Sequence, residues 1–459
     1  MLSTQSRRRS THLTGLAALT VALAAAGLCA PANAAAQPSA AQASAALDVL
    51  APLDTLYPTL DALYQDLHRH PELSLHELNT AAHLATLLRA QGFEVTAKVG
   101  GTGVVGVLRN GPGPTVLLRT ELDALPVHEE TGLPYASVVT TKDDRGVDVP
   151  VAHACGHDVH MTAWVGAATL LSRSRAHWRG TVLMIGQPAE ERVVGARAMI
   201  EDGLLRRFPR PDFAVAIHDS PLFASGQVAH RPGFAMAAAD TVEIVIYGRG
   251  GHGAAPQLTV DPVLIAARTV EALQSLVSRE TNPLDSAVVT VGSIHGGTKG
   301  NIIPDEVTLQ LTVRSYQEAV QKHLLEGIAR IAKAEAQAGA APREPTVTVL
   351  PESAHATYND PTLDARLAAM LGRELGAAHV VEAGPLMVSE DFSEFGRAGI
   401  PSVQIWVGAA EPVALAKATA EGRALPGLHS SKFAPDREPT LRTAVKVMTL
   451  SALELLGKA

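Results

Sequence analysis

Residues 153–160 read His-Ala-Cys-Gly-His-Asp-Val-His, which places three imidazoles, a thiol and a carboxylate within eight positions. Such a group of polar side chains is costly to bury without a partner. A divalent metal ion is the natural partner, because thiolate and imidazole are ligands that zinc and its neighbours accept. A polar loop that is merely rich in histidine would give the same composition, so this stretch indicates a metal site without establishing one.

Two carboxylates stand at the end of an apolar stretch, residues 115–119, that predicts a buried strand. Glu121 and Asp123 are two positions apart, so their side chains are expected to point to one side. Open α/β sheets bind ligands at the carboxyl ends of their strands, and the Val-Leu-Leu run is typical of a central strand. We therefore expect this pair to face a functional site, with a solvated strand end as the alternative.

A second acidic pair, Glu190 and Glu191, follows another predicted strand over residues 181–185. Adjacent carboxylates repel each other unless a cation or a proton separates their roles. One metal ligand and one general base is a chemically sensible division of those roles. The charged start of a helix is the alternative, since glutamate is favoured in first turns.

Two further histidines lie next to predicted elements of the chain. His218 follows the apolar residues 212–217, and His429 precedes a closing helix predicted over residues 438–456. Each alone would more often be a structural or loop histidine. A strand-like Asp-Val-Pro-Val precedes His153, so four separate strand ends, the one before His218 included, deliver ligand-type side chains. Four such ends are hard to reconcile with chance, so we expect them to meet where the strands of a sheet end.

The elements that must position these residues belong to the α/β class, since Ala- and Gly-rich helices alternate with Val/Ile strands. The chain exceeds a comfortable single core, so two domains are expected. Residues 239–353 predict the order β-α-β-β-α-β, the ferredoxin-like pattern, which is complete in itself. We therefore predict an inserted lid or dimerisation domain there, between two parts of a catalytic domain, residues 50–238 and 354–459.

The first 34 residues predict a secretory signal peptide. Three arginines precede an apolar run over residues 13–30, and Ala32-Asn33-Ala34 is a small-x-small cleavage signal. We expect cleavage after Ala34 and export to the periplasm or the medium. An uncleaved N-terminal anchor is the alternative, but no second apolar span follows.

Charge and cysteine content restrict the possible partners. Removal of residues 1–34 leaves 35 basic and 46 acidic residues, a formal net charge of −11, without a block of like charge. Nucleic acid and anionic membrane are therefore poor candidates for partners. The mature chain keeps one cysteine, Cys155, and a lone thiol in an oxidising compartment should be buried, reactive or bound to metal. The neighbours of Cys155 favour metal.

Several of these motifs occur together, in order, in one known family. The chain resembles the amidohydrolase branch of the co-catalytic metallopeptidase and aminoacylase family, which includes hippurate hydrolases, N-acyl-amino-acid amidohydrolases and plant auxin-conjugate hydrolases. The similarity covers nearly the whole mature chain, from His70 to Ser430. The matching motifs are Glu121-Leu-Asp-Ala-Leu-Pro, His-Ala-Cys-Gly-His-Asp, Gln-Pro-Ala-Glu-Glu, Ile-His218, Gly-Gly-His252-Gly-Ala, Asn301-Ile-Ile-Pro and Ser-Glu-Asp-Phe.

This resemblance implies a metallopeptidase-like catalytic domain with a mixed central sheet and a site for two divalent metal ions. Zn²⁺ or Mn²⁺ is expected, with Co²⁺ or Ni²⁺ as alternatives, because mixed sulfur, nitrogen and oxygen ligands accept several metals. The implied ligands are the bridging thiolate of Cys155 together with His157, Glu191, His218 and His429.

The resemblance also implies roles for residues that do not bind metal. Glu190 is similar to the family's general base, and Asp123 to a carboxylate that orients a ligand. Asn301 and Arg314 resemble residues of the lid that hold the substrate carboxylate. His252 resembles a lid histidine that reaches an active site, in dimers that of the partner, and stabilises the reacting oxygen. A homodimer through the inserted domain is expected, since an edge strand there could pair.

Two positions depart from the family pattern. The branch usually has Asp where this chain has Glu121, so Glu121 is left out of the predicted ligands. The run from His218 to Pro221 lacks the aromatic residue often seen after the histidine, which bears on the substrate pocket.

We hypothesise that the chain hydrolyses the amide bond of an N-acyl amino acid or a related small conjugate, with a metal-activated water and Glu190 as base. One alternative is a dipeptidase or carboxypeptidase with the same two-metal site; a free amine would need an acidic partner. Another is an exported metal- or solute-binding protein without catalysis, although metal capture needs no spare base. Serine hydrolases and zinc deaminases are disfavoured, because the G-x-S-x-G and P-C-x-x-C motifs are missing.

Overall fold

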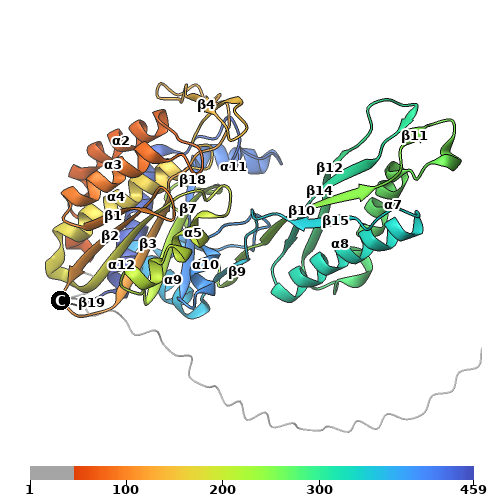
Figure 1. The fold of residues 1–459 in the computed structure, drawn as a ribbon. Coiled ribbons are helices and arrows are strands. Elements are labelled where there is room, and N and C mark those ends of the chain that lie inside the picture. The colour runs from red at the N-terminus through yellow and green to blue at the C-terminus, as the bar shows by residue number, and fades with distance from the viewer. Residues whose placement is uncertain (1–45, 459) are drawn as a thin grey trace, which may run out of the picture.

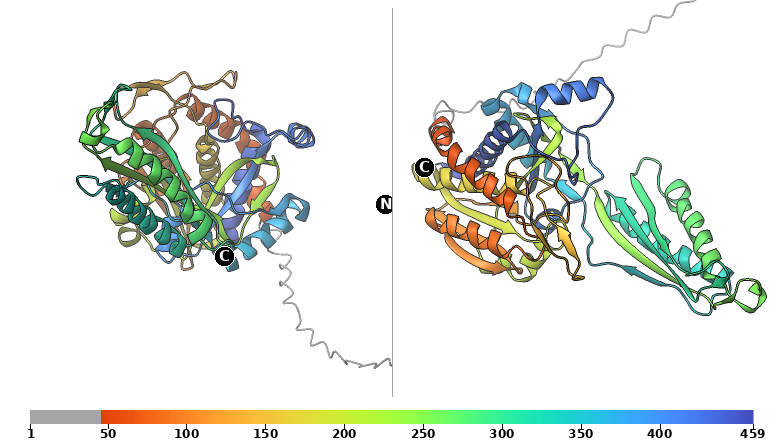
Figure 2. Two further views of the ribbon diagram at one scale, coloured as in Figure 1. Left: turned by 90° about the vertical axis from the view of Figure 1, so that its right-hand side faces the viewer. Right: turned by 90° about the horizontal axis from the view of Figure 1, so that it is seen from above.

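The computed structural model describes residues 46–458, so the predicted signal peptide lies outside the described residues. Figure 1 shows two bodies, a larger α/β body and a smaller one. The smaller body contains the elements of residues 238–349, and we call it the lid. The right panel of Figure 2 shows the lid standing away from the larger body on a narrow connection. No helix within the described part of the chain is long and apolar enough to cross a membrane.

A mixed sheet of nine strands runs through the larger body. Its parallel centre has the order β6-β3-β7-β18, formed by β6 (Trp178–Gln187), β3 (Thr115–Glu121), β7 (Phe213–Ala224) and β18 (Ser402–Ala410). Every residue of β3 is buried, as expected for a strand that is covered on both faces. The prediction of an α/β fold with a mixed central sheet is confirmed.

Shorter or antiparallel strands complete the two edges of this sheet. At one edge, β2 (Gly103–Asn110) pairs antiparallel with β6, and β1 (Glu94–Val99) pairs antiparallel with β2. At the other edge, β8 (Val228–His230) pairs antiparallel with β18, and β17 (Val380–Glu382) lies parallel to β8. The pair of terminal residues in β19 (Gly457–Lys458) adds to β6.

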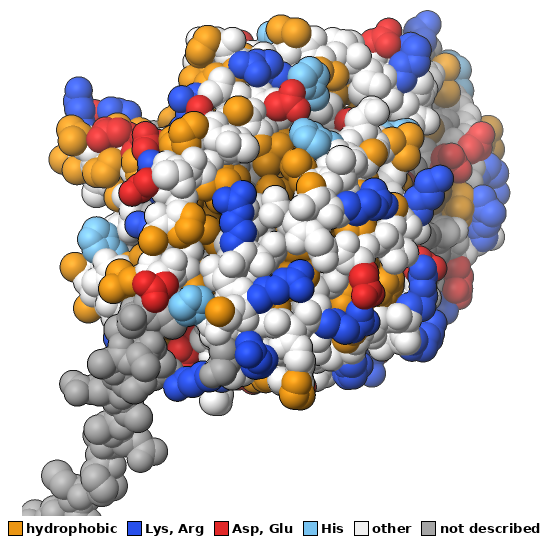
Figure 3. Space-filling model, turned by 90° about the vertical axis from the view of Figure 1, so that its left-hand side faces the viewer, with side chains coloured by type: hydrophobic (Ala, Val, Ile, Leu, Met, Phe, Trp, Pro, Cys, Tyr) orange, Lys and Arg blue, Asp and Glu red, His pale blue; other side chains and the backbone are white. Residues whose placement is uncertain are grey.

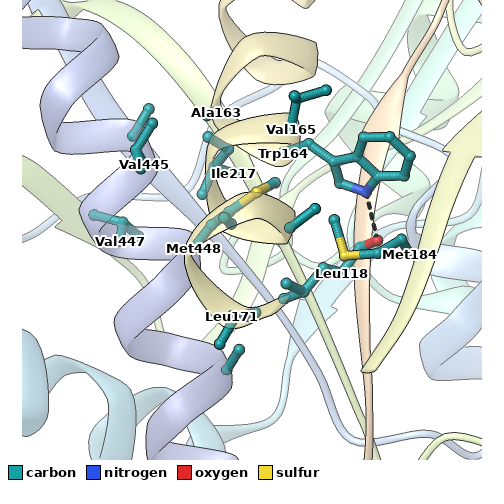
Figure 4. Packing of buried hydrophobic residues seen from close by; sticks show 14 of the residues in the cluster. Leu118, Ala163, Trp164, Val165, Leu171, Met184, Ile217, Val445, Val447 and Met448 are labelled. Carbon is teal, nitrogen blue, oxygen red and sulfur yellow. Dashed lines mark hydrogen bonds between the residues drawn. The ribbon is translucent and has the colours of Figure 1, made fainter. Parts of the chain in front are cut away.

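Helices cover both faces of the sheet. On one face, α4 (His157–Arg173) and α12 (Arg437–Leu455) lie side by side, as Figure 4 shows, and both pack against the sheet. Trp164 on α4 donates its indole N–H to the main-chain oxygen of Leu118, at 3.0 Å, which ties the helix to β3. α2 (Leu53–Arg69) and α3 (Leu78–Ala90) extend this layer, and α5 (Gly195–Glu201) and α10 (Ser393–Arg397) pack on the opposite face.

The apolar side chains of the central strands alternate between these two layers. Leu118 belongs to the buried cluster around α4, whereas its neighbour Leu117 belongs to the cluster that contains Met199 and Phe395. This is the period of two expected of a strand, and it explains why the central strands read as continuous apolar runs. The face of the larger body that points away from the lid carries acidic and basic side chains interspersed with uncharged surface (Figure 3).

The lid has its own sheet and its own core. Its strands form a four-stranded antiparallel sheet in the order β12-β14-β10-β15. Buried residues of the lid, among them Ile244, Leu309 and Ile328, form a hydrophobic cluster separate from those of the larger body. The predicted order β-α-β-β-α-β is found in β10 (Ala238–Tyr247), α7 (Pro262–Ser275), β12 (Ala287–His295), β14 (Glu306–Ser315), α8 (Glu318–Ala338) and β15 (Thr346–Val349).

Candidate metal centre and active site

The predicted ligands come together from separate elements of the larger body. His157 is the first residue of α4, His218 lies within β7, and Glu191 follows β6. His429 lies in the loop before α12, and its amide donates to the main-chain oxygen of Ala154 at 2.7 Å. The chain therefore brings all these side chains together at the C-terminal ends of the parallel strands, as the sequence predicts.

The helix that follows Cys155 begins within the His-Ala-Cys-Gly-His motif. The apolar stretch that predicts a helix begins only at Met161, but α4 begins at His157, directly after Gly156. Gly156 has a φ of 79°, a left-handed conformation that favours glycine. A Cβ at this position would lie 2.2 Å from Asp219 Oδ1, so a larger residue would clash as well. The glycine thus allows the sharp turn between Cys155 and His157.

Cys155 lies at the middle of the predicted ligands. Its Sγ is 3.6 Å from His218 Nε2 and 3.3 Å from His429 Nε2. Cys155, His157 and His218 offer one group of three ligand atoms, and Cys155, Glu191 and His429 offer another; within each group the atoms lie within 4.8 Å of one another. The thiol is shared by both groups, as a bridging ligand would be.

Two ligand atoms of this cluster lack a partner. His157 Nε2 and Glu191 Oε1 are buried, and neither has a hydrogen-bond partner within residues 46–458. These two atoms are 3.9 Å apart. Buried polar atoms without a partner cost stability, so such a pair requires an explanation. A divalent metal ion fits this donor set, because zinc-like ions accept thiolate, imidazole and carboxylate together.

Asp123 supports the cluster from behind. His157 donates its Nδ1–H to the main-chain oxygen of Asp123 at 2.8 Å, which leaves Nε2 directed at the ligand group. The Asp123 carboxylate accepts hydrogen bonds from Ser74 Oγ at 2.7 Å and from the amide of Glu191 at 3.0 Å. Asp123 therefore connects two predicted ligands, which is how outer residues commonly orient metal-binding side chains.

Burial and neighbouring carboxylates disfavour the ionised forms of two predicted ligands. Burial, followed by the neighbouring Glu191 and Glu190 carboxylates, raises the pKa of the Cys155 thiol well above its ordinary value. Burial also raises the pKa of Glu191 to about 7. A dication would reverse this effect, because a metal-bound thiol is held as thiolate.

Glu190 lies next to the ligand group. Its Oε2 is 3.6 Å from His157 Nε2, and only 5% of the residue is exposed. Burial, together with the carboxylates of Glu390 and Glu191, raises the pKa of Glu190 well above its ordinary value. A carboxyl group with a raised pKa beside a metal site is suited to accept and return a proton.

A cavity of about 590 Å³ opens over Cys155, Glu190 and Glu191. This volume is in the range typical of small-molecule sites. Much of its wall is apolar and comes from residues far apart in the sequence, namely Leu222, Met236, Leu386, Val388, Trp406 and Leu428. None of these residues was singled out from the sequence, since isolated apolar residues carry no motif.

Arg314 is the lid residue that reaches this cavity. It lies on β14, and its Nη1 donates to Ser389 Oγ at 2.8 Å. Among the residues that line the cavity, Arg314 is the one lysine or arginine. The cavity therefore has a cation on its lid side and apolar side chains along its wall.

His252 and Asn301 do not line the cavity. His252 lies on β11 (Gly251–His252), which pairs with β13 (Ile302–Ile303) directly after Asn301. Figure 1 shows β11 at the end of the lid that points away from the larger body. The Ala254 amide donates to His252 Nδ1 at 3.0 Å, so Nε2 carries the proton and can donate. Within one chain, the structure keeps these two predicted residues apart from the ligand cluster.

The carboxylate of Glu121 forms hydrogen bonds with Arg119 and His160, neither of which is a predicted metal ligand. It is fully buried, accepts a hydrogen bond from Arg119, and accepts one from His160 Nδ1 at 2.8 Å. Arg119 is also fully buried and pairs with Glu390 at 2.7 Å and Asp391 at 3.0 Å. The Ser-Glu-Asp-Phe motif therefore lies beneath the site as part of a buried ionic network. The signal in the sequence was an arginine at the end of an apolar strand.

The comparisons with known proteins agree with this geometry. The model of peptidase family M20/M25/M40 matches residues 117–422. An IAA-amino acid hydrolase of Arabidopsis thaliana, ILR1-like 2, is 39% identical over 336 residues, which are 72% of this chain and 72% of the relative. Hippurate hydrolase of Campylobacter jejuni is 37% identical over 76% of this chain and 88% of the relative. Thermostable carboxypeptidase 1 of Saccharolobus solfataricus is 35% identical over 85% of this chain and 94% of the relative.

Solved structures show the same fold. A protein from methicillin-resistant Staphylococcus aureus aligns with a TM-score of 0.77 and 31% identity, over 89% of this chain and 99% of that one. The YXEP protein of Bacillus subtilis, described as a dinuclear metal-binding peptidase, aligns with a TM-score of 0.70 and 28% identity, over 88% of this chain and all of that one.

Proposed function

The chain belongs to peptidase family M20/M25/M40, and from this premise we propose that it is a metal-dependent amidohydrolase that cleaves N-acyl amino acids or related small conjugates. The observation that carries this proposal is one cavity that is lined by four of the five proposed ligands, a spare carboxylate and a lid cation. Glu190 is the spare carboxylate and Arg314 is the cation. A protein that only captured metal would need neither.

Two divalent metal ions fit the ligand cluster, with Cys155 as the shared ligand and His157, Glu191, His218 and His429 as the others. We propose Zn²⁺ or Mn²⁺, with Co²⁺ or Ni²⁺ as alternatives for this mixed donor set. When bound, such ions would polarise the amide carbonyl and lower the pKa of a water molecule. Asp123 would hold His157 in the tautomer that binds through Nε2.

Glu190 is the proposed general base. Its carboxylate lines the cavity beside the ligand cluster, where it would take a proton from the attacking water and deliver it to the leaving nitrogen. Burial favours the protonated form of Glu190, which is the form that must return the proton.

The two sides of the cavity suggest how a substrate would lie. A free carboxylate would pair with the Arg314 guanidinium, which offers a planar pair of donors. The acyl group would then contact the apolar wall, where Met236 and Trp406 are buried and Leu222 is exposed. A substrate with an apolar acyl group and a free carboxylate matches both sides.

A carboxypeptidase or dipeptidase remains the second candidate, because Arg314 would hold the carboxylate of a peptide equally well and one relative is named a carboxypeptidase. A free dipeptide also has an amine, which needs an acidic partner. The acidic residues that line the cavity are Glu190, Glu191 and Asp219, and we assign each of them to the metal site or to its support. This arrangement favours an acylated nitrogen over a free amine.

We also propose that two copies pair through the lid. β12 is an edge strand of the lid sheet, so its outer backbone groups are available to a second copy. Ile294 on this strand and Leu284 before it are exposed apolar side chains. In such a dimer the partner's His252 would donate from Nε2 to the reacting oxygen, which its place at the end of the lid otherwise prevents.

Export is a further part of this proposal, based on the signal peptide predicted over residues 1–34. N-terminal sequencing of the protein purified from a periplasmic fraction should give a chain that begins at residue 35. A chain that retains its first residues would contradict this.

The test of function uses protein without residues 1–34, assayed with N-acetyl and N-benzoyl amino acids and with the matching free dipeptides. We expect release of the free amino acid from the acylated substrates, loss of this activity with a chelator, and recovery with zinc or manganese. Faster cleavage of the dipeptides would support the second candidate instead. A metal-loaded protein that cleaves neither class would contradict the proposed function.

A further inference from the structure

His160 is a buried histidine to which the proposed reaction gives no role. It lies one turn into α4, and its Nδ1–H donates to Glu121 Oε2 at 2.8 Å. Its Nε2 accepts from the Asp219 amide at 2.9 Å, and Asp219 Oδ1 lies 3.2 Å from the same nitrogen. All three residues are fully buried, so these contacts form in a medium where hydrogen bonds are strong.

The His160 ring packs against the ring of a proposed metal ligand. The centroids of His160 and His218 are 4.6 Å apart and their planes make an angle of 70°, an edge-to-face arrangement. His218 in turn donates its Nδ1–H to the main-chain oxygen of Asp219 at 2.8 Å. The Asp219 backbone is therefore held at its amide by one imidazole and holds the other imidazole at its carbonyl.

Asp219 also touches the segment that carries two more ligands. Its carboxylate lies against Gly156, where an added Cβ would be 2.2 Å from Oδ1. Gly156 stands between Cys155 and His157, so this contact fixes the distance between β7 and the start of α4. Three of the five proposed ligands are thus in contact with, or next to a residue in contact with, Asp219: His218 through the Asp219 main chain, and Cys155 and His157 through its carboxylate against Gly156.

We propose that Glu121, His160 and Asp219 form a positioning unit, which fixes His218 and the Cys155–His157 segment in the arrangement that binds metal. This inference rests on the metal centre of the proposed function. Glu121 is the outer member: it spans from the end of β3 to His160, while its other oxygen is held by the buried Arg119. The unit also gives Glu121, excluded from the ligand set, a defined task.

A second buried imidazole provides a matched control. His68 Nδ1 lies 2.6 Å from Asp158 Oδ2, and His68 Nε2 lies 3.1 Å from Glu129 Oε1. His68, like His160, is a buried histidine beside two acidic residues, but its ring packs on Tyr64 and Tyr135 rather than on a metal ligand. A change at Glu129 therefore disturbs a buried pair without disturbing the orientation of a ligand.

The test compares Glu121→Gln and Asp219→Ala with Glu129→Gln in the full mature chain. Metal-free protein is titrated with Co²⁺, and the absorption bands of the bound ion, including the thiolate band from Cys155, are recorded with the dissociation constants. Outer partners of metal ligands typically contribute about 10- to 100-fold in affinity. We expect a loss of that size for at least one equivalent of Co²⁺, with shifted bands, in the first two variants. Glu129→Gln should bind as the wild type does.

Thermal unfolding of the metal-free proteins, followed by circular dichroism, separates positioning from folding. We expect both variants at the positioning unit to lose Co²⁺ affinity while the midpoints of their thermal unfolding stay within a few degrees of that of Glu129→Gln. Should Glu121→Gln not fold, Asp219→Ala decides, because it removes the carboxylate that lies against Gly156 and keeps the Glu121 pair with Arg119. Wild-type affinity and spectrum in the folded variants, or an equal loss in Glu129→Gln, would overturn the proposal. A wild-type chain that binds no metal would overturn the proposed function as well.

Discussion

The two bodies of the molecule contribute to the candidate site in unequal ways. In the larger body, each group of ligand atoms already lies within 4.8 Å and is backed by buried hydrogen bonds. In the lid, Arg314 reaches the cavity, whereas His252 and Asn301 lie elsewhere. Under the proposed function, metal binding would be pre-organised within one chain, while completion of the catalytic site would depend on how the lid meets a substrate or a second copy.

The largest expected effect lies on the pre-organised side. Glu190→Gln keeps the size of the side chain and removes the base, so kcat should fall by about 10²- to 10⁴-fold. The metal content, measured by atomic emission, should stay that of the wild type. Glu129→Gln serves as the control for removal of a buried carboxylate at a place the reaction does not use. A turnover within a few-fold of the wild type would show that Glu190 is not the base.

The next effect belongs to the lid. His252→Ala should lower kcat by about 10²- to 10³-fold, the usual size for loss of one donor to the reacting oxygen, and should leave metal affinity unchanged. Mixing this variant with Glu190→Gln tests where the histidine acts. If the histidine serves the partner's site, the mixed dimer has one intact site and activity returns. No recovery on mixing would place the histidine in its own chain or outside catalysis.

Arg314 should give a smaller effect, on binding rather than on turnover. Arg314→Ala should raise KM about 10- to 100-fold for a substrate with a free carboxylate, since a hydrogen bond to a charged group contributes about 1.5–3 kcal/mol. Arg314→Lys should recover part of this loss, because it keeps the charge without the planar fork. The carboxamide analogue of the substrate is the control. An equal change in KM for both substrates would argue against a carboxylate clamp.

Removal of metal is expected to have the smallest effect, a change in amide hydrogen exchange that is confined to the larger body. Chelation should reduce hydrogen-exchange protection at the start of α4 and at β7, because a ligand that binds the native state stabilises the elements that hold it. The amides of β10 and β14 should exchange as before, since the lid has a core of its own. Equal loss of hydrogen-exchange protection in both bodies would show that the stability of the lid also depends on bound metal.

Much of the fold and of the ligand cluster could be predicted because the signals are local. Apolar runs such as residues 115–119 identify a central strand, and the parallel centre of the sheet then brings Glu191 and His218 to one edge. Ligand-type residues at several strand ends are informative even when each alone is not. The predicted domain boundaries and the roles assigned to the site residues stay predictions until the experiments above are made.

The rest could not be predicted because it depends on packing between distant segments. Glu121 and His160 are 39 positions apart, and nothing in either local sequence shows that one accepts a hydrogen bond from the other. The apolar wall of the cavity is assembled from β7, β9 (Gly233–Met236), β18, the segment between β17 and α10, and the loop before His429. The distance of His252 from the cavity depends on the orientation of the lid, which no periodicity encodes.

We propose that Cys155 and four side chains around it bind two metal ions, and the metal content of the mature protein tests this most directly. Protein purified without chelator, supplied with zinc and manganese and then desalted, is analysed by inductively coupled plasma mass spectrometry. We predict two metal ions per chain in the wild type and loss of bound metal in Cys155→Ser. In the wild type, thiol reagents should not titrate the Cys155 thiol until the metal is removed. A wild-type protein without metal, with a Cys155 thiol that reacts freely, would contradict the account.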